Sequence, residues 1–241
     1  MIAVTRTELL RDLLDNGRHY DVSLLEEHAT RLHLPMADVL AVAGHSVPGH
    51  LLPPDRDRGI LRAFAYRVTY CNHAQLAALH DFVAAMPALG TPPAPRPGRD
   101  LADSDPFPAV LKNLMDNRGL GLPEFPFVGL SRVTIRGMLG GAWHRLSQLQ
   151  AVAGPLGWRV ADLAALAGER LHPLDHGPIL CHHVGAVFLA AVPCTTEQLT
   201  HAAHKADQLS ARENHGAWQP VSYGIDNCPD ANAVQDEPDP Q

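Results

Sequence analysis

The sequence predicts an all-α protein composed of two related helical modules. Apolar residues recur at intervals of three and four along most of the chain, as they do on one face of a helix. No segment shows the sustained alternation and the enrichment in β-branched residues that are typical of strands. The third observation is a repeat: residues 25–44 align without gaps on residues 149–168, and eight of the 20 aligned positions are identical.

Two shorter matches extend this repeat and indicate that its second copy is longer. Residues 71–76 resemble residues 194–199 at an offset of 123, close to the offset of 124 between the longer segments. Near the start of each copy, residues 13–16 resemble residues 114–117 at an offset of only 101. The second copy therefore contains an insertion near its start, 23 residues long if offsets of 124 and 101 are compared.

Composition and charge exclude several classes of protein. No apolar run approaches the ~20 residues needed to span a membrane, and the N-terminus lacks an export signal, so we expect a cytoplasmic protein without membrane contact. Four cysteines without close paired spacing favour reduced thiols over disulfides. The net charge of −7 argues against nucleic-acid binding by the chain as a whole. Residues 107–171 are nevertheless basic, with seven Lys and Arg against four Asp and Glu.

The first module, residues 1–86, is predicted to begin with two short helices. Leucine side chains share one face of a helix over residues 7–14. A second helix is predicted over residues 24–32, with Ser23 as its N-cap and Glu26 three residues later as the partner in a capping box.

Proline and glycine divide the rest of this module. Pro35 is predicted to open the next helix and Gly44 to end it. Three prolines make residues 47–54 irregular, after which residues 57–71 and 74–86 are predicted to form a helical hairpin.

The remaining segments differ clearly in composition. Residues 87–106 are rich in proline and are predicted to be a stiff, extended linker between the modules. The second module then covers residues 107–212. Residues 213–241 are acidic and polar, and we expect them to form a disordered tail.

The insertion of the second module has the pattern of a helix, a turn and a short helix. Four apolar residues lie on one face of the predicted leading helix: Val110, Leu111, Leu114 and Met115. A tight turn at Gly129 and Leu130 leads to Ser131, the predicted N-cap of a short helix that buries Ile135 and ends at a glycine pair. This is the order of elements in a helix-turn-helix DNA reader, whose second helix enters the major groove.

Here the chain resembles the bacterial repressor-type helix-turn-helix family known as Xre or Cro/CI-like. The resemblance covers residues 107–168, and it rests on Arg118-Gly119-Leu120, Gly129-Leu130-Ser131, Thr134-Ile135, Gly140-Gly141 and the leucines that lead to Leu156-Gly157. It implies sequence-specific binding to double-stranded DNA. The residues that it places against DNA are Ser131, Arg132, Val133, Thr134, Arg136, Arg145 and Lys112.

The resemblance also suggests a role for each kind of side chain in this set. Arg132 is suited to a bidentate contact with guanine O6 and N7, worth about 1–3 kcal/mol of discrimination. Ser131, Arg136, Arg145 and Lys112 are better suited to phosphates, which fix the register of the protein on the duplex.

The chain departs from the family in the second helix of the motif. Residues 122–128 are one residue shorter than that helix usually is, and they contain Pro123 and Pro126. Because a proline beyond the first turn removes a hydrogen bond and disturbs the helix, we expect a single turn or an irregular loop here.

The first module lacks the reader, because only seven residues lie between Asn16 and Leu24. It keeps the scaffold helices, and we expect residues 1–86 to serve packing, dimerisation or the binding of a protein partner. A homodimer is expected because one reader helix contacts only a few base pairs.

Other kinds of chemistry have weaker support. Five potential metal ligands lie close together in the sequence: His172, His176, Cys181, His182 and His183. Only His172 and His176 have an acceptable pair spacing, so we expect no metal site. Cys181 and Cys194 lack a recognisable triad and there is no glycine-rich phosphate loop, so we expect neither an enzyme nor a cofactor.

The sequence therefore favours a transcription regulator that reads the major groove with the helix starting at Ser131. Two alternatives stay open. One is a helical adaptor or scaffold that has kept the fold and lost DNA binding. The other is an antitoxin-like regulator that binds a protein and represses its own operon.

Overall fold

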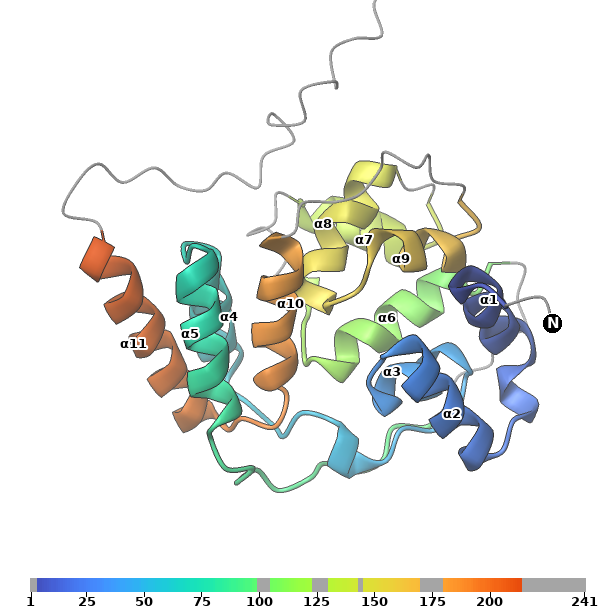
Figure 1. Ribbon diagram of the computed structural model, residues 1–241, viewed down its shortest axis with the longest axis horizontal. Coiled ribbons are helices and arrows are strands. Elements are labelled where there is room, and N and C mark those ends of the chain that lie inside the picture. Colours follow the sequence, from blue (N-terminus) through green and yellow to red (C-terminus); the bar gives the residue numbers. More distant parts are fainter. Residues whose placement is uncertain (1–3, 99–104, 123–129, 143–144, 170–179, 214–241) are drawn as a thin grey trace, which may run out of the picture.

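The computed structural model describes residues 4–98, 105–122, 130–142, 145–169 and 180–213, and this part of the chain is helical without a strand (Figure 1). The first half contains α1 (Arg6–Asn16), η1 (Gly17–His19), α2 (Val22–Leu32), α3 (Met36–Val42), η2 (Gly49–Leu51), α4 (Arg58–Val68) and α5 (His73–Ala84). The second half contains α6 (Phe107–Asn117), α7 (Arg132–Leu139), α8 (Leu146–Leu156), α9 (Val160–Leu166), α10 (Leu180–Ala190) and α11 (Thr196–Glu213). The predicted all-α class is confirmed. None of the described helices has the length and apolarity to cross a membrane.

Short polar side chains set most helix starts. Thr5 and Glu8 form a capping box at the start of α1, and Asp57 caps α4. The prediction of Ser23 as the cap of α2 is wrong, because the Asp21 carboxylate accepts the N–H of Leu24 at 2.9 Å and the helix begins at Val22. Asp and Ser compete for the same role, and the aspartate comes two residues earlier.

Helix lengths recur between the two halves. α2 and α8 both have 11 residues and start 124 residues apart, and α3 and α9 both have seven residues at the same offset. α1 and α6 also have 11 residues each, and their starts are 101 residues apart. α2 packs on α3 as α8 packs on α9. Between α1 and α2 the chain makes only the short turn η1, whereas α7 lies between α6 and α8.

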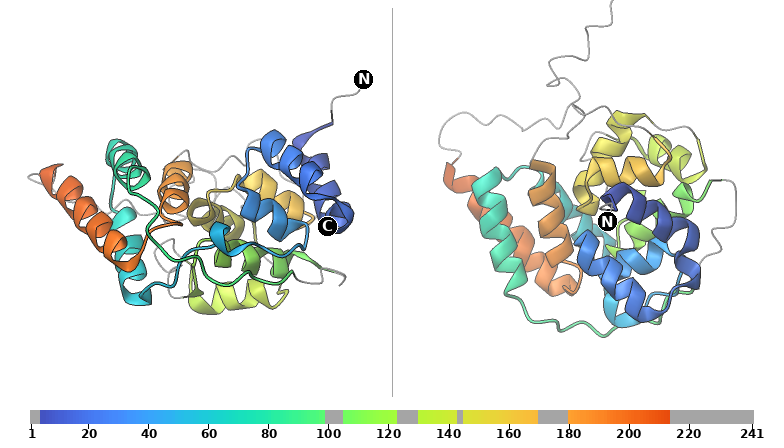
Figure 2. Two further views of the ribbon diagram at one scale, coloured as in Figure 1. Left: turned by 90° about the horizontal axis from the view of Figure 1, so that it is seen from below. Right: turned by 45° about the vertical axis from the view of Figure 1, so that its right-hand side comes forward.

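The halves are interlocked through their helices. α1 packs on α9, and α6 packs on α3. On the other side of the molecule, α4 packs on α11, and α5 packs on both α10 and α11. These helices stand beside each other in Figures 1 and 2. The two helices of the predicted hairpin are present as α4 and α5, but their pairing as a hairpin is wrong, because each packs on helices of the other half more closely than on the other.

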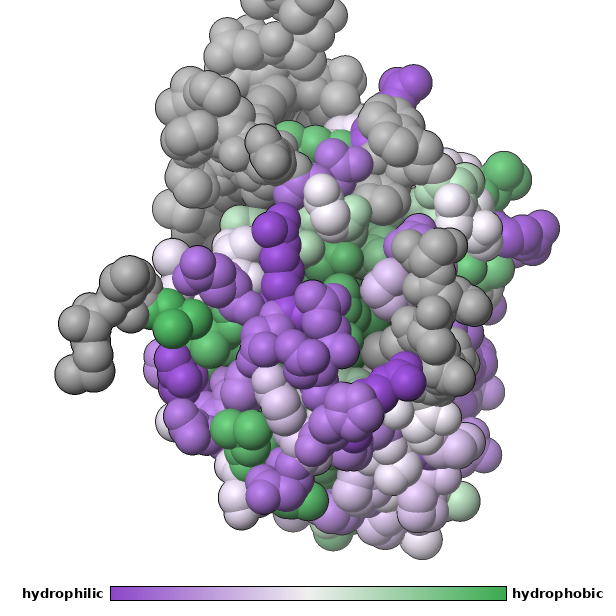
Figure 3. Space-filling model, turned by 90° about the vertical axis from the view of Figure 1, so that its right-hand side faces the viewer, coloured by the Kyte–Doolittle hydropathy of each residue, from purple (hydrophilic) through white to green (hydrophobic). Residues whose placement is uncertain are grey.

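One continuous hydrophobic core includes residues from both halves. Its largest fully buried side chains include Phe64 and Leu10 from the first half and Phe107 and Trp158 from the second. The rings of Phe64 and Phe188 meet edge to face at 5.9 Å across the α4–α10 side of this core. On the surface formed by the α1–α3 end, hydrophilic side chains predominate and hydrophobic ones form separate patches (Figure 3).

Two aspartates bind arginines of the opposite half. Asp38 in α3 is buried and accepts hydrogen bonds from the Arg118 guanidinium at 2.6 and 2.8 Å. The Asn117 amide and the Trp158 indole N–H also donate to Asp38, both at 2.8 Å. Asp162 occupies the equivalent place in α9 and accepts three hydrogen bonds from Arg6, at 2.7 to 2.9 Å. These ion pairs fix α3 against α6 and α9 against α1.

Residues 87–98 of the predicted linker run along the molecule without forming a helix. Arg96 and Val47 exchange two backbone hydrogen bonds of 2.9 Å, and the Arg96 guanidinium also donates to Asn117 Oδ1 and to the carbonyl of Asn113. At the other end, the Gln198 amide donates to the carbonyl of Pro87 at 2.7 Å. The linker is thus attached to both halves.

Candidate nucleic-acid interface

α7 is capped at its start as the sequence predicts. The Ser131 hydroxyl accepts the backbone N–H of Thr134 at 3.0 Å, and the two side-chain hydroxyls lie 2.8 Å apart in a hydrogen bond. Ser131 and Thr134 were both predicted to face DNA. Because their hydroxyls are engaged with each other, their main contribution in this structure is to define the first turn of the helix.

One face of α7 is buried and fixes the helix on the scaffold. Ile135 and Met138 on this face are 0% and 2% exposed. α7 packs on α6, whose four predicted inward residues are all buried: Val110, Leu111, Leu114 and Met115. Gly140 ends the helix, and Gly141 follows with a φ of +77°, a left-handed conformation that favours glycine.

The opposite face of α7 is directed to solvent. Arg132, Val133 and Arg136 are exposed on it. At 100° per residue, Val133 lies almost opposite the midpoint between Ile135 and Met138. Its side chain is 76% exposed, the highest value among the large hydrophobic residues of the described chain. A β-branched apolar residue so placed contributes little to the core.

The charges near α7 are positive and mostly uncompensated. Within the described residues, no carboxylate pairs with Arg132 or Arg136, and residues 130–161 contain no Asp or Glu. Arg145 is exposed at the start of α8, where its backbone N–H bonds to the Gln148 side chain at 3.0 Å.

Two other cations of the basic stretch contribute less to the surface. Lys112 in α6 pairs with Asp116 one turn later, so the charge predicted to meet a phosphate has an intramolecular partner. Arg118 is buried and paired with Asp38. Within the basic stretch, exposed cations without a carboxylate partner in the described chain therefore lie on α7 and at the start of α8. Arg159, at the start of α9, is a further exposed cation of the same stretch.

Several sequence-based predictions fall outside the described residues. This holds for residues 123–129, which include both prolines of the short second helix, and for His172 and His176. Of the histidine cluster, His183 can be placed, and its ring meets that of His73 at a centroid distance of 3.8 Å. Among the described residues, no group of three or more His, Cys, Asp or Glu side chains is arranged to hold a metal.

The two described cysteines lie at equivalent points before α5 and α11 and are buried. Burial raises the pKa of the Cys71 thiol to about 11, with a further contribution from the negative charge of Asp207. Burial also raises the pKa of Cys194, although the positive charge of Arg56 opposes this. Both thiols are therefore protonated and weakly nucleophilic at neutral pH.

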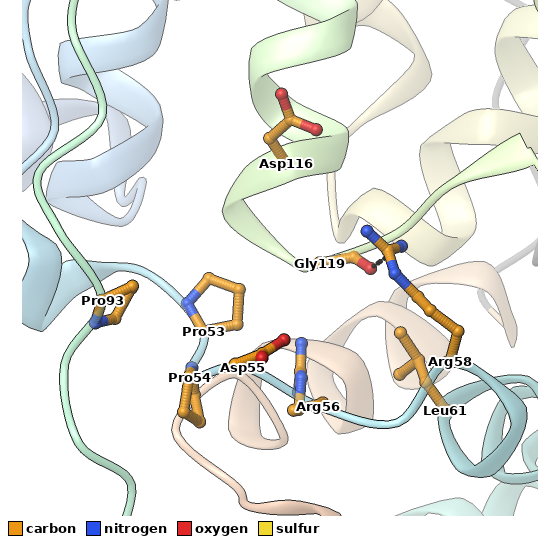
Figure 4. A pocket seen from close by; sticks show the side chains of 9 residues that line it. All are labelled: Pro53, Pro54, Asp55, Arg56, Arg58, Leu61, Pro93, Asp116 and Gly119. Atoms are coloured by element: carbon orange, nitrogen blue, oxygen red, sulfur yellow. Dashed lines mark hydrogen bonds between the residues drawn. The ribbon is translucent and has the colours of Figure 1, made fainter.

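A second surface feature was missed by the sequence analysis. It is a hollow of about 350 Å³ where the loop before α4 meets the end of α6 (Figure 4). Arg56 donates to the carbonyls of Ala191 and Arg118 at 2.9 and 2.8 Å, and Arg58 donates to that of Gly119 at 2.9 Å. Burial lowers the pKa of Arg56 to about 10. Because their donors satisfy carbonyls at the ends of α6 and α10, these arginines join the halves.

Comparison of the chain with models of known protein families, with curated proteins and with solved structures finds no match.

Proposed function

We propose that this protein is a sequence-specific DNA-binding regulator that inserts α7 into the major groove. The observation that carries the proposal is the division of α7 into two faces. Ile135 and Met138 hold one face on the core, while Arg132 and Arg136 on the other have no carboxylate partner in the described chain.

The dimensions of α7 support this proposal. An α-helix with its side chains is about 10–12 Å in diameter, and the major groove is about 12 Å wide, so α7 fits the groove. The exposed arginines can reach guanine edges or phosphates from such a helix. Arg145, at the start of α8, is suited to a flanking phosphate, and Lys112 could contribute to one only by releasing Asp116.

We infer in addition that the two halves are copies of one helical module and that the second contains a repressor-like helix-turn-helix. The recurring helix lengths, the reciprocal contacts of α1 with α9 and of α6 with α3, and the equivalent aspartates Asp38 and Asp162 support this inference. Since η1 stands in the first half where α7 stands in the second, each chain has one reader helix. A homodimer would provide the second reader that an extended operator requires.

A helical adaptor is the second candidate function. It is favoured by the net charge of −7 and by the exposure of Val133, since an apolar side chain is as suitable for a protein surface as for a base. In that case α7 would bind a protein partner and the arginines would set the orientation of the complex.

Selection from random DNA duplexes, followed by fluorescence anisotropy, distinguishes these functions. We expect the wild type to enrich one sequence, and Arg132→Ala/Arg136→Ala to bind it about 10- to 100-fold more weakly with a smaller salt dependence. The control Arg11→Ala/Arg62→Ala removes the same charge from exposed positions of α1 and α4 and should bind almost as the wild type does. Absence of enrichment would support the adaptor, and an equal loss in both double variants would contradict the insertion of α7 into the groove.

A further inference from the structure

The outward face of α7 carries an apolar side chain where solvent alone would favour a polar one. Val133 is 76% exposed, and the exposed Arg132 and Arg136 lie beside it, one turn apart on the same side. The two nearest hydroxyls, on Ser131 and Thr134, are occupied by the cap. A partner that approaches this face therefore meets one branched hydrocarbon group beside two cations.

Gly137 lies one helical turn after Val133, on the same side of α7. A Cβ atom added at this residue would have Ala142 Cβ at 3.6 Å as its nearest neighbour, which is an ordinary contact, and the backbone there is not left-handed. Neither packing within the described chain nor backbone conformation requires glycine at this position. Glycine is unfavourable inside a helix. At this position it means that no side chain projects from the helix beside Val133.

Together these features describe a surface for close approach by an anionic partner that also presents a methyl group. Duplex DNA has both, because each thymine carries a 5-methyl group in the major groove and the flanking phosphates are negative. Guanine presents O6 and N7 in the same groove and accepts two hydrogen bonds from an arginine.

Building on the proposed function, we infer that α7 recognises a thymine next to a guanine. Val133 contacts the thymine methyl group, and Arg132, the preceding residue, binds the neighbouring guanine. Gly137 allows the helix to lie close to the base edges, and Arg136 binds a phosphate at the border of the groove. The operator is thus defined chemically by a methyl group and a purine acceptor pair on adjacent base pairs.

Chemically altered duplexes test this inference. In the selected sequence, uracil replaces each thymine in turn, which removes only the methyl group. We expect one such position to lower the affinity of the wild type about fourfold, the effect of losing one buried methyl group. 7-Deazaguanine at the adjacent guanine should lower it about tenfold. Uracil outside the selected site is the control and should change nothing.

Two protein variants connect these effects to α7. Val133→Ala should bind the thymine and uracil duplexes equally, because the contact with the methyl group is lost. Gly137→Ala should bind about tenfold more weakly, because its methyl group meets the duplex. Its urea midpoint should be unchanged or higher than that of the wild type, since alanine favours a helix.

The outcomes separate the two levels of the proposal. If no duplex is enriched by the wild type, the proposed function fails and this inference fails with it. If a duplex is enriched but its affinity is insensitive to every uracil substitution, or if Val133→Ala retains the full difference between thymine and uracil, DNA binding stands and the recognition by Val133 is wrong.

Discussion

Asp38 and Asp162 occupy the same place in the two halves, yet their surroundings differ. Both bind an arginine of the opposite half. The side chains of Asp38 and Arg118 are each 1% exposed, and an amide and an indole complete the acceptor capacity of Asp38. Asp162 is 5% exposed, but its partner Arg6 is 23% exposed and reaches water. An equivalent residue is thus part of the core in one half and part of its border in the other.

The difference shows where the molecule is fixed most firmly. Asn117 and Arg118, which both bind Asp38, stand at the end of α6, the helix on which α7 packs. The first half, in which only η1 lies between α1 and α2, thereby holds α6, the helix that supports α7. On the proposed function, the first module acts on DNA binding through this contact.

Removing the charge of Asp38 is expected to have the largest effect on stability. In Asp38→Asn, the Arg118 guanidinium stays buried without its counter-ion, which typically costs about 3–5 kcal/mol. Urea unfolding followed by circular dichroism should show a midpoint far below that of the wild type. A loss under 1 kcal/mol would mean that Arg118 can move to water.

The same substitution at Asp162 should be milder. In Asp162→Asn, Arg6 can turn its partly exposed side chain toward solvent, so we expect a loss of about 1–2 kcal/mol. The comparison of the two variants under identical urea conditions is the decisive measurement. Equal losses would contradict the distinction between the core site and the border site.

The caps of α5 and α11 offer a smaller version of this comparison. Asn72 accepts the N–H of Gln75 at 3.0 Å, whereas Thr195 accepts that of Gln198 at 3.4 Å. We expect Asn72→Ala to destabilise the protein by about 1 kcal/mol and Thr195→Ala by about 0.5 kcal/mol, because the longer hydrogen bond is weaker. A greater loss in Thr195→Ala, again by urea unfolding, would reverse this order.

Ionisation of Cys71, which precedes α5, is expected to affect stability at alkaline pH. Because the pKa of Cys71 is raised in the folded protein, the folded state keeps a proton that the unfolded state loses, and stability should fall as the pH rises from about 9 to about 11. The Cys71→Ala variant should lose less stability over this pH interval than the wild type. At neutral pH the thiol is protonated in both the folded and the unfolded state, so its ionisation does not affect stability there. Parallel curves for the two proteins would show that Cys71 titrates normally.

The features that were predicted correctly from the sequence are local ones. The cap at Ser131, the start of α3 after Pro35 and the inward face of α6 depend on residues within one or two turns of each other. Ser23 shows the limit even of local rules, since Asp21 was an equally good cap at a nearby position.

The partners that cross between the halves could not be predicted in this way. Arg118 was counted among the seven cations of the basic stretch, and nothing near it in the sequence indicates that Asp38, 80 residues away, would bury its charge. The packing of α4 on α11 could not be predicted for the same reason. Helical periodicity indicates which face of a helix is apolar, but it does not indicate which helix covers that face. By comparison, the cap and the two faces of α7 could be predicted, because the residues that encode them lie within ten positions of each other. Gly137 could have been noticed as a glycine inside a short helix.

The interlocking of the two halves also has a consequence for synthesis on the ribosome. Arg6 meets Asp162 across 156 residues, and α4 finds its main partner in α11, which ends at Glu213. At typical rates of translation, the helices that cover the apolar faces of α1, α4 and α5 are synthesised on the order of ten seconds after those faces. We therefore expect the nascent first half to expose apolar surface that chaperones can bind until the last described helix has emerged. Contacts so distant in sequence are also expected to slow the folding of the finished chain.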